Sequence, residues 1–191
     1  MEVIVKQLGT EYNRSTYACP PKYALRGRQR TKIARWVISC VKSVDELFLC
    51  MWILDRVRRN NTWSVQMAAV LVANKTHTTS TLSNARAIDK YSWNIDAATL
   101  FREEVDILVQ VGWHVPLLMV STCIAKMSRL FVNVNMCVRH MMDVCTGLIM
   151  NEPNLCCVDV CTRAILLELH DNAAAIQYWN NYVKCLYKSF N

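Results

Sequence analysis

The chain has 191 residues, of which 53% are apolar, so it can bury the core of one large domain or of two small ones. Its formal net charge of +7 at pH 7 favours an acidic partner, either nucleic acid or an acidic protein surface. Four glycines, four prolines and the scarcity of alternating apolar and polar residues argue against a β protein and predict an all-α fold.

The N-terminal part of the sequence predicts an irregular extension followed by two helices. Residues 1–28 lack helical periodicity, and apolar side chains then recur with helical spacing over 29–42. Ser43 and Glu46 form a capping-box signature that starts a second helix, predicted to run to about residue 58. This second helix is apolar on nearly all sides, so we expect it at the centre of a helical bundle.

Further helical patterns follow, separated by polar or proline-containing breaks. Gly112 and Pro116 mark the main break, with five predicted helices before it and about four after it. Before the break, the remaining helices are predicted over 63–75, 82–91 and 96–111. After the break, helices are predicted near 117–131, 134–150, 155–170 and 173–189.

The sequence predicts no membrane segment. The longest apolar run, LFLCMWIL at 47–54, is much shorter than the roughly 20 residues that cross a bilayer. The N-terminal residues lack the basic and apolar regions and the small-residue cleavage site of a secretory signal. We therefore expect the protein in the nucleus and cytoplasm.

The ten cysteines raise the question of disulfides or a metal site. Without a secretory signal we expect reduced thiols, and several cysteines lie on apolar helix faces, which favours core packing. These are Cys40, Cys50, Cys123, Cys137 and Cys161. A zinc site is less favoured, because the candidate spacing does not match the paired C-x(2–4)-C ligands of structural zinc. Those candidates are His140, Cys145, Cys156, Cys157 and Cys161. We expect no metal and no cofactor.

Four charged residues occupy apolar helix faces. Arg30, Asp55, Lys75 and Glu104 lie at helical spacing from apolar residues in the first, second, third and fifth predicted helices. An unpaired buried charge costs several kcal/mol, so these groups must pair, reach solvent or meet a partner. Their charges sum to zero, which favours pairing. The alternative is that the long side chains of Arg30 and Lys75, near helix ends, extend to water.

Together with their neighbours, these residues resemble a cyclin box over residues 29–116. The first helix carries an arginine and a tryptophan six residues apart, the second ends in LDR, the third ends in A-x-K, and the fifth contains E-x-x-I-L before an aromatic residue. The matching residues are Arg30, Trp36, Asp55, Ala73, Lys75, Glu104, Ile107, Leu108 and Trp113. The resemblance covers almost half of the chain.

The resemblance implies a regulatory subunit without catalytic residues. Cyclins bind cyclin-dependent kinases and activate them by stabilising the active position of the kinase αC helix, which promotes cell-cycle or transcriptional phosphorylation. By resemblance, Arg30 and Asp55 form a buried structural ion pair. Lys75 and Glu104 are expected to lie side by side and to bind the kinase.

The resemblance also identifies a remnant of the groove in which cyclins dock Arg-x-Leu substrates. Gln29 and Lys32 stand where the family has apolar residues, so we expect docking to be weak or absent. The members of this remnant are Gln29, Ile33, Trp36 and Trp63.

The resemblance further implies two lobes. Residues 1–28 would be an N-terminal extension, 29–114 the cyclin box, and 115–191 a second, reduced cyclin-like lobe. The second lobe has room for about four helices where cyclins have five, so the chain looks more like the viral cyclins than the longer cellular ones.

Other functions remain open on the sequence. The transcription factor IIB and retinoblastoma pocket families use the same fold as a scaffold that binds transcription machinery or DNA without kinase activation. The basic run at 26–35 can serve nuclear import or contact nucleic acid, although such runs are more often the solvated start of a helix. No aromatic residues alternate with its charges, so direct nucleic-acid binding is not expected. A helical enzyme is a remote third option, because no P-loop or G-x-S-x-G motif is present.

Overall fold

The computed structural model is all-helical over the residues that it describes. These are 22–77, 82–116, 119–129, 137–153, 156–169, 176–177 and 180–181. Most of the predicted extension at 1–28 and most of the predicted last helix at 173–189 lie outside the described residues.

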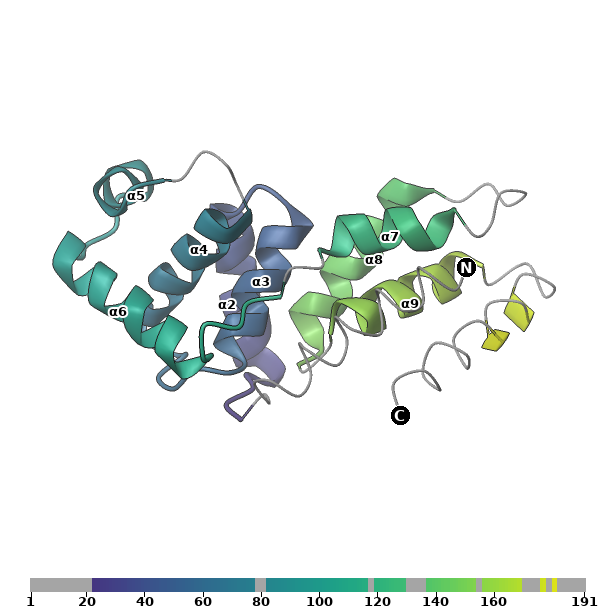
Figure 1. Ribbon diagram of the computed structural model, residues 1–191, viewed down its shortest axis with the longest axis horizontal. Coiled ribbons are helices and arrows are strands. Elements are labelled where there is room, and N and C mark those ends of the chain that lie inside the picture. The colour runs from purple at the N-terminus through teal and green to yellow at the C-terminus, as the bar shows by residue number, and fades with distance from the viewer. Residues whose placement is uncertain are drawn as a thin grey trace.

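Eight helices follow one another in the described part of the chain, without a strand. The first five are α2 (Gly27–Cys40), α3 (Val44–Leu54), α4 (Trp63–His77), α5 (Asn84–Tyr91) and α6 (Ala97–Gln110). The last three are α7 (Val120–Ser128), α8 (Val138–Asn151) and α9 (Cys157–Glu168). The all-α prediction and the order of these eight helices are confirmed. In Figure 1, α2 to α6 lie at one end of the molecule and α7 to α9 at the other.

Helix α3 lies at the centre of the molecule, as its apolar sequence predicted. Every residue from Asp45 to Leu54 is buried, and the helix packs against α2, α4, α7 and α8. Ser43 caps its start by accepting a hydrogen bond from the Glu46 N–H at 3.2 Å. Because α3 contacts helices from both ends of the molecule, it is the shared core element (Figure 1).

The prediction that this helix continues to residue 58 is wrong, since α3 ends at Leu54. Asn60 donates its side-chain amide to the Leu54 carbonyl at 2.8 Å, which satisfies a carbonyl group at the helix end. Arg59 has a φ of 55°, so the chain turns there. The sequence pattern missed this end because Val57 is apolar and buried, and it therefore continues the apolar spacing.

A buried carboxylate on α3 caps a helix that is distant in sequence. Asp45 accepts hydrogen bonds from the Ser121 N–H at 2.9 Å and from the Ser121 hydroxyl at 2.5 Å. Met119, the N-cap residue of α7, makes no such bond with its own side chain. His77 Nε2, at the end of α4, lies 3.2 Å from Asp45 Oδ2, the oxygen that also accepts the Ser121 hydroxyl. Asp45 thus joins α3, α4 and α7.

Most of the described cysteines are buried and free, which confirms core packing for Cys40, Cys50, Cys123 and Cys161. The prediction is wrong for Cys137, which is exposed. This residue lies just before α8, where helical spacing no longer determines which face is buried. Within the described residues, none of the helices is long and apolar enough to cross a membrane.

Replacing Asp45 with alanine should destabilise the fold. The change leaves the start of α7 without its cap and removes a charge-assisted hydrogen bond, so we expect a loss of about 1–3 kcal/mol in the free energy of unfolding. Urea unfolding followed by circular dichroism measures it. Asp89→Ala, at an exposed position of α5, is the matched control and should change stability by less than about 0.5 kcal/mol. Equal stability of the two variants would contradict the capping role.

Candidate functional site

Arg30 and Asp55 form a buried ion pair. Arg30 Nη1 lies 2.5 Å from Asp55 Oδ1, and each side chain is only 3% exposed. Asp55 is the C-cap residue of α3, and its Oδ1 also accepts the Leu25 N–H at 3.3 Å. The Arg30–Asp55 pair therefore holds α2 and the segment before it against the end of α3.

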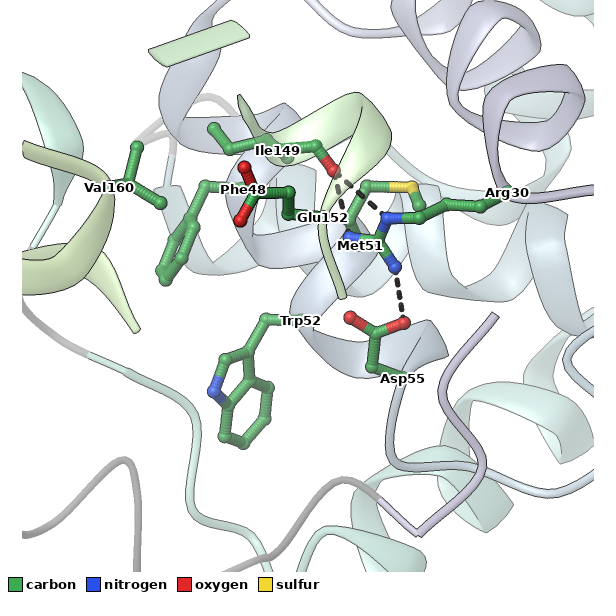
Figure 2. Close-up of a pocket in the computed structure, with 8 residues that line it drawn as sticks. All are labelled: Arg30, Phe48, Met51, Trp52, Asp55, Ile149, Glu152 and Val160. Carbon is green, nitrogen blue, oxygen red and sulfur yellow. Dashed lines mark hydrogen bonds and ion pairs between the residues drawn. The ribbon is translucent and has the colours of Figure 1, made fainter. Parts of the chain in front are cut away.

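The guanidinium group of Arg30 also reaches α8. Its Nε and Nη2 donate to the Ile149 carbonyl at 3.2 and 2.8 Å. Figure 2 shows this fork between the carboxylate of Asp55 and the backbone of α8. The carbonyl lies in the last turn of α8, where the helix dipole favours a cation. A small cavity of about 10 Å³ adjoins the pair, with Met51 and Trp52 in its lining.

Lys75 and Glu104 lie side by side on α4 and α6. Lys75 Nζ is 2.8 Å from Oε1 and 2.9 Å from Oε2 of Glu104. The two groups differ in burial, because the Lys75 side chain is 34% exposed and that of Glu104 is 6% exposed. A buried carboxylate thus neutralises an ammonium group that solvent can still reach.

Asn84 completes this cluster and was not identified from the sequence. Its Oδ1 accepts from Lys75 Nζ at 2.7 Å, and its Nδ2 donates to Glu104 Oε2 at 2.9 Å. Asn84 is the first residue of α5, whose N-cap Ser83 accepts the Arg86 N–H at 3.3 Å. The sequence predicted a helix over 82–91, but nothing local indicated that the Asn84 side chain would face side chains from α4 and α6.

An exposed apolar stripe runs along α6, the helix that also carries Glu104. Phe101, Val105 and Val109 are spaced four residues apart, so they share one helix face. Trp113 follows after the helix, and the four side chains are between 37% and 65% exposed. The opposite side of α6 buries Glu104 and Ile107. Of these four residues only Trp113 was among the predicted ones, because apolar spacing in a sequence identifies the helix face that packs into the core.

The four residues of the predicted groove remnant have different environments. Ile33 is buried in the core, and Gln29 is exposed. Trp36 is half-buried and meets Trp63 edge to face, with ring centroids 4.7 Å apart. Trp93 lies 6.3 Å from Trp36 and extends this aromatic contact to the segment after α5. The remnant is therefore a tryptophan cluster with a polar neighbour rather than a continuous apolar groove.

Comparison with known proteins shows a similarity in structure but none in sequence. No protein-family model matches the sequence, and no curated protein sequence matches it. The structure is similar to the X-ray structure of a viral cyclin from herpesvirus saimiri, with a TM-score of 0.70. The match covers 96% of this chain and 88% of that one, at 14% sequence identity. The chain therefore has the cyclin fold.

Removing one partner of the buried Arg30–Asp55 pair should lower the free energy of unfolding far more than removing one partner of an exposed pair. We expect Asp55→Ala to lower the free energy of unfolding by about 3–5 kcal/mol, because it leaves the Arg30 charge buried without its counterion. Chemical denaturation monitored by tryptophan fluorescence measures the loss. Arg163→Ala is the control, since Arg163 pairs with Glu152 where both side chains are more than 40% exposed; it should cost less than about 1 kcal/mol. Similar losses for the two variants would show that the buried pair is not structural.

Proposed function

We propose that the chain is a cyclin-like regulatory subunit that binds and activates a cyclin-dependent kinase. The observation that carries the proposal is the solvent-accessible Lys75 ammonium, neutralised by the buried Glu104 of α6, together with the exposed apolar stripe on the same helix α6. The cyclin fold and the position of this pair within it support the same function. In this proposal the chain contributes no catalytic group.

The electrostatics of the cluster suit a protein interface. A partner that covers Lys75 meets an ammonium already paired with Glu104, so the cost of removing its charge from water is lower than for an isolated lysine. Asn84 fixes the position of both groups. A partner backbone carbonyl can approach the exposed side of the Lys75 ammonium. The pair would therefore give orientation and specificity to the interface.

The apolar stripe would supply most of the affinity. Large aromatic side chains such as Phe101 and Trp113 dominate binding when a partner buries them. Contiguous exposed apolar side chains on a folded protein commonly mark such interfaces. The stripe lies on α6, which also carries Glu104, the counterion of Lys75 on α4, so we expect one partner surface that covers α6 and the end of α4 to contact both.

Activation would follow from preferential binding to one kinase conformation. A protein kinase holds ATP productively when its β3 lysine pairs with a glutamate of its αC helix. A partner that binds the conformation with this pair formed more tightly shifts the kinase population toward it. Docking of Arg-x-Leu substrates would be weak, because Gln29 and Lys32 are exposed and polar where an apolar groove is needed.

A second candidate is a scaffold that binds transcription machinery or DNA without activating a kinase. The observation in its favour is the exposure of four basic side chains on or next to α2. These are Arg26, Arg28, Lys32 and Arg35. We favour the kinase partner, because this scaffold function would leave the α6 stripe unused.

The charged pair is tested by direct binding to purified cyclin-dependent kinases. We expect Lys75→Ala to weaken binding at least 10-fold, measured by biolayer interferometry, because it removes the cation and leaves Glu104 buried without its partner. Lys90→Ala, an exposed lysine on α5, should bind as the wild type does. Kinase activity toward a peptide substrate should rise on addition of the wild-type chain. Binding of wild type to none of the kinases, or equal binding by Lys75→Ala, would contradict the proposed face.

The apolar stripe makes a separate prediction. Phe101→Ala and Trp113→Ala should each reduce kinase affinity at least 10-fold while leaving the melting temperature nearly unchanged, because both side chains are mostly exposed. Leu166→Ala, an exposed apolar residue on α9, is the control and should retain affinity. Binding to double-stranded DNA that depends on Lys32 and Arg35, with no kinase affinity, would favour the scaffold instead.

A further inference from the structure

Three buried cysteine side chains meet between α7 and α9. The Sγ atoms of Cys123, Cys157 and Cys161 all lie within 4.8 Å of one another. Cys123 comes from the middle of α7, and Cys157 and Cys161 lie four residues apart on one face of α9. A fourth cysteine, Cys145 on α8, is fully buried and lies next to the Cys161 thiol. We call these four residues the thiol cluster.

The spacing of the sulfur atoms is close to that of a metal site. In a tetrahedral zinc site with Zn–S distances of about 2.3 Å, neighbouring sulfurs are about 3.8 Å apart. The three sulfurs that lie within 4.8 Å of one another need only a small contraction to reach this distance. Cys157 and Cys161 form a C-x3-C pair, and structural zinc sites use such pairs together with further ligands from other segments.

The cluster is closed to solvent. Cys123, Cys145 and Cys161 have no exposed surface, and Cys157 is 5% exposed. A structural zinc site is closed in the same way, with four protein ligands and no bound water, whereas a catalytic site keeps an open position. The geometry thus favours a structural ion over a reactive one.

The chemistry of the cluster suits a thiophilic cation. Cysteine sulfur is a ligand that Zn²⁺ and other soft cations prefer, and three cysteine sulfurs converge at this point. Cys157 is also the first residue of α9, where the helix dipole favours a negatively charged sulfur.

We propose that Cys123, Cys145, Cys157 and Cys161 bind one Zn²⁺ ion that ties α7, α8 and α9 together. Each sulfur donates an electron pair to the ion, and the sulfurs that are still thiols release their protons to solvent, without any oxidation or reduction. On binding the ion, Cys161 gives up its weak hydrogen bond to the Val120 carbonyl oxygen, which lies 3.6 Å from the Cys161 Sγ atom. This site is independent of the proposed kinase-binding face.

The proposed site differs from the expectation of packed thiols without metal. The sequence candidates included His140, but this side chain is exposed and lies 2.5 Å from Glu168. They omitted Cys123, which is 34 residues before Cys157 in the sequence. Only the packing of α7 against α9 brings Cys123 to the pair on α9.

The experiment measures metal in the full chain purified under reducing conditions without chelators. Mass spectrometry of the eluted metal should give about one Zn²⁺ per chain. Replacement by Co²⁺ should give intense thiolate-to-cobalt absorption in the near ultraviolet together with the visible bands of a tetrahedral site. Removing the ion with a chelator should lower the melting temperature, because an ion bound only by the folded state stabilises it.

Variants locate the site. Cys123→Ser and Cys161→Ser should each reduce bound zinc at least tenfold, and Cys145→Ser should weaken zinc affinity and alter the cobalt spectrum. Cys50→Ser is the matched control, since Cys50 is fully buried in α3 outside the thiol cluster, and it should retain zinc. If the serine variants do not fold, the wild-type cobalt spectrum still decides. Folded, reduced wild-type protein without zinc and without cobalt–thiolate absorption would overturn the proposal, as would zinc retained by Cys123→Ser and Cys161→Ser.

Discussion

The buried guanidinium of Arg30 links the two ends of the molecule. It pairs with Asp55 at the end of α3 and donates to the Ile149 carbonyl at the end of α8. Removing a charge from water is costly, so an arginine is stable in this position only when a carboxylate and further acceptors surround it. The arrangement therefore depends on three segments being in place at once, which makes it a strong constraint on how α8 packs against α2 and α3.

The same logic applies to the other buried charges. Asp45 accepts hydrogen bonds from the start of α7, and Glu104 accepts hydrogen bonds from Lys75 and Asn84. The side chains in these interactions differ in solvent exposure. This difference distinguishes the charges that stabilise the fold from the charge that can bind a partner. Arg30, Asp55 and Asp45 are enclosed by this chain, whereas Lys75 remains one-third exposed while it pairs with Glu104 of α6. A charge that is paired but accessible is suited to a partner in a way that an enclosed pair is not.

The two ends of the molecule share one apolar core, and they differ in the polar and sulfur groups that lie within it. In α2 to α6, a large apolar core surrounds α3 and ion pairs connect the helices. In α7 to α9 the same core continues through apolar residues such as Ile124 and Ile165, and three cysteine sulfurs of α7 and α9 lie within 4.8 Å of one another. A short helical unit has less apolar area to bury, and a bound ion is one way for such a unit to gain stability.

The sequence by itself determined the helical class, the order of the eight helices, the central position of α3 and the four charges on apolar faces. These properties depend on local spacing and composition, which a single sequence contains. The end of α3 at Leu54 and the position of Asn84 beside Lys75 depended on contacts between different segments. The exposed stripe around Phe101 depended on which side of α6 packs against the rest of the chain. Only the tertiary structure decided those, and also which cysteines meet, because spacing in the chain does not fix distance in space. Cys123 and Cys157 are neighbours only because α7 packs on α9.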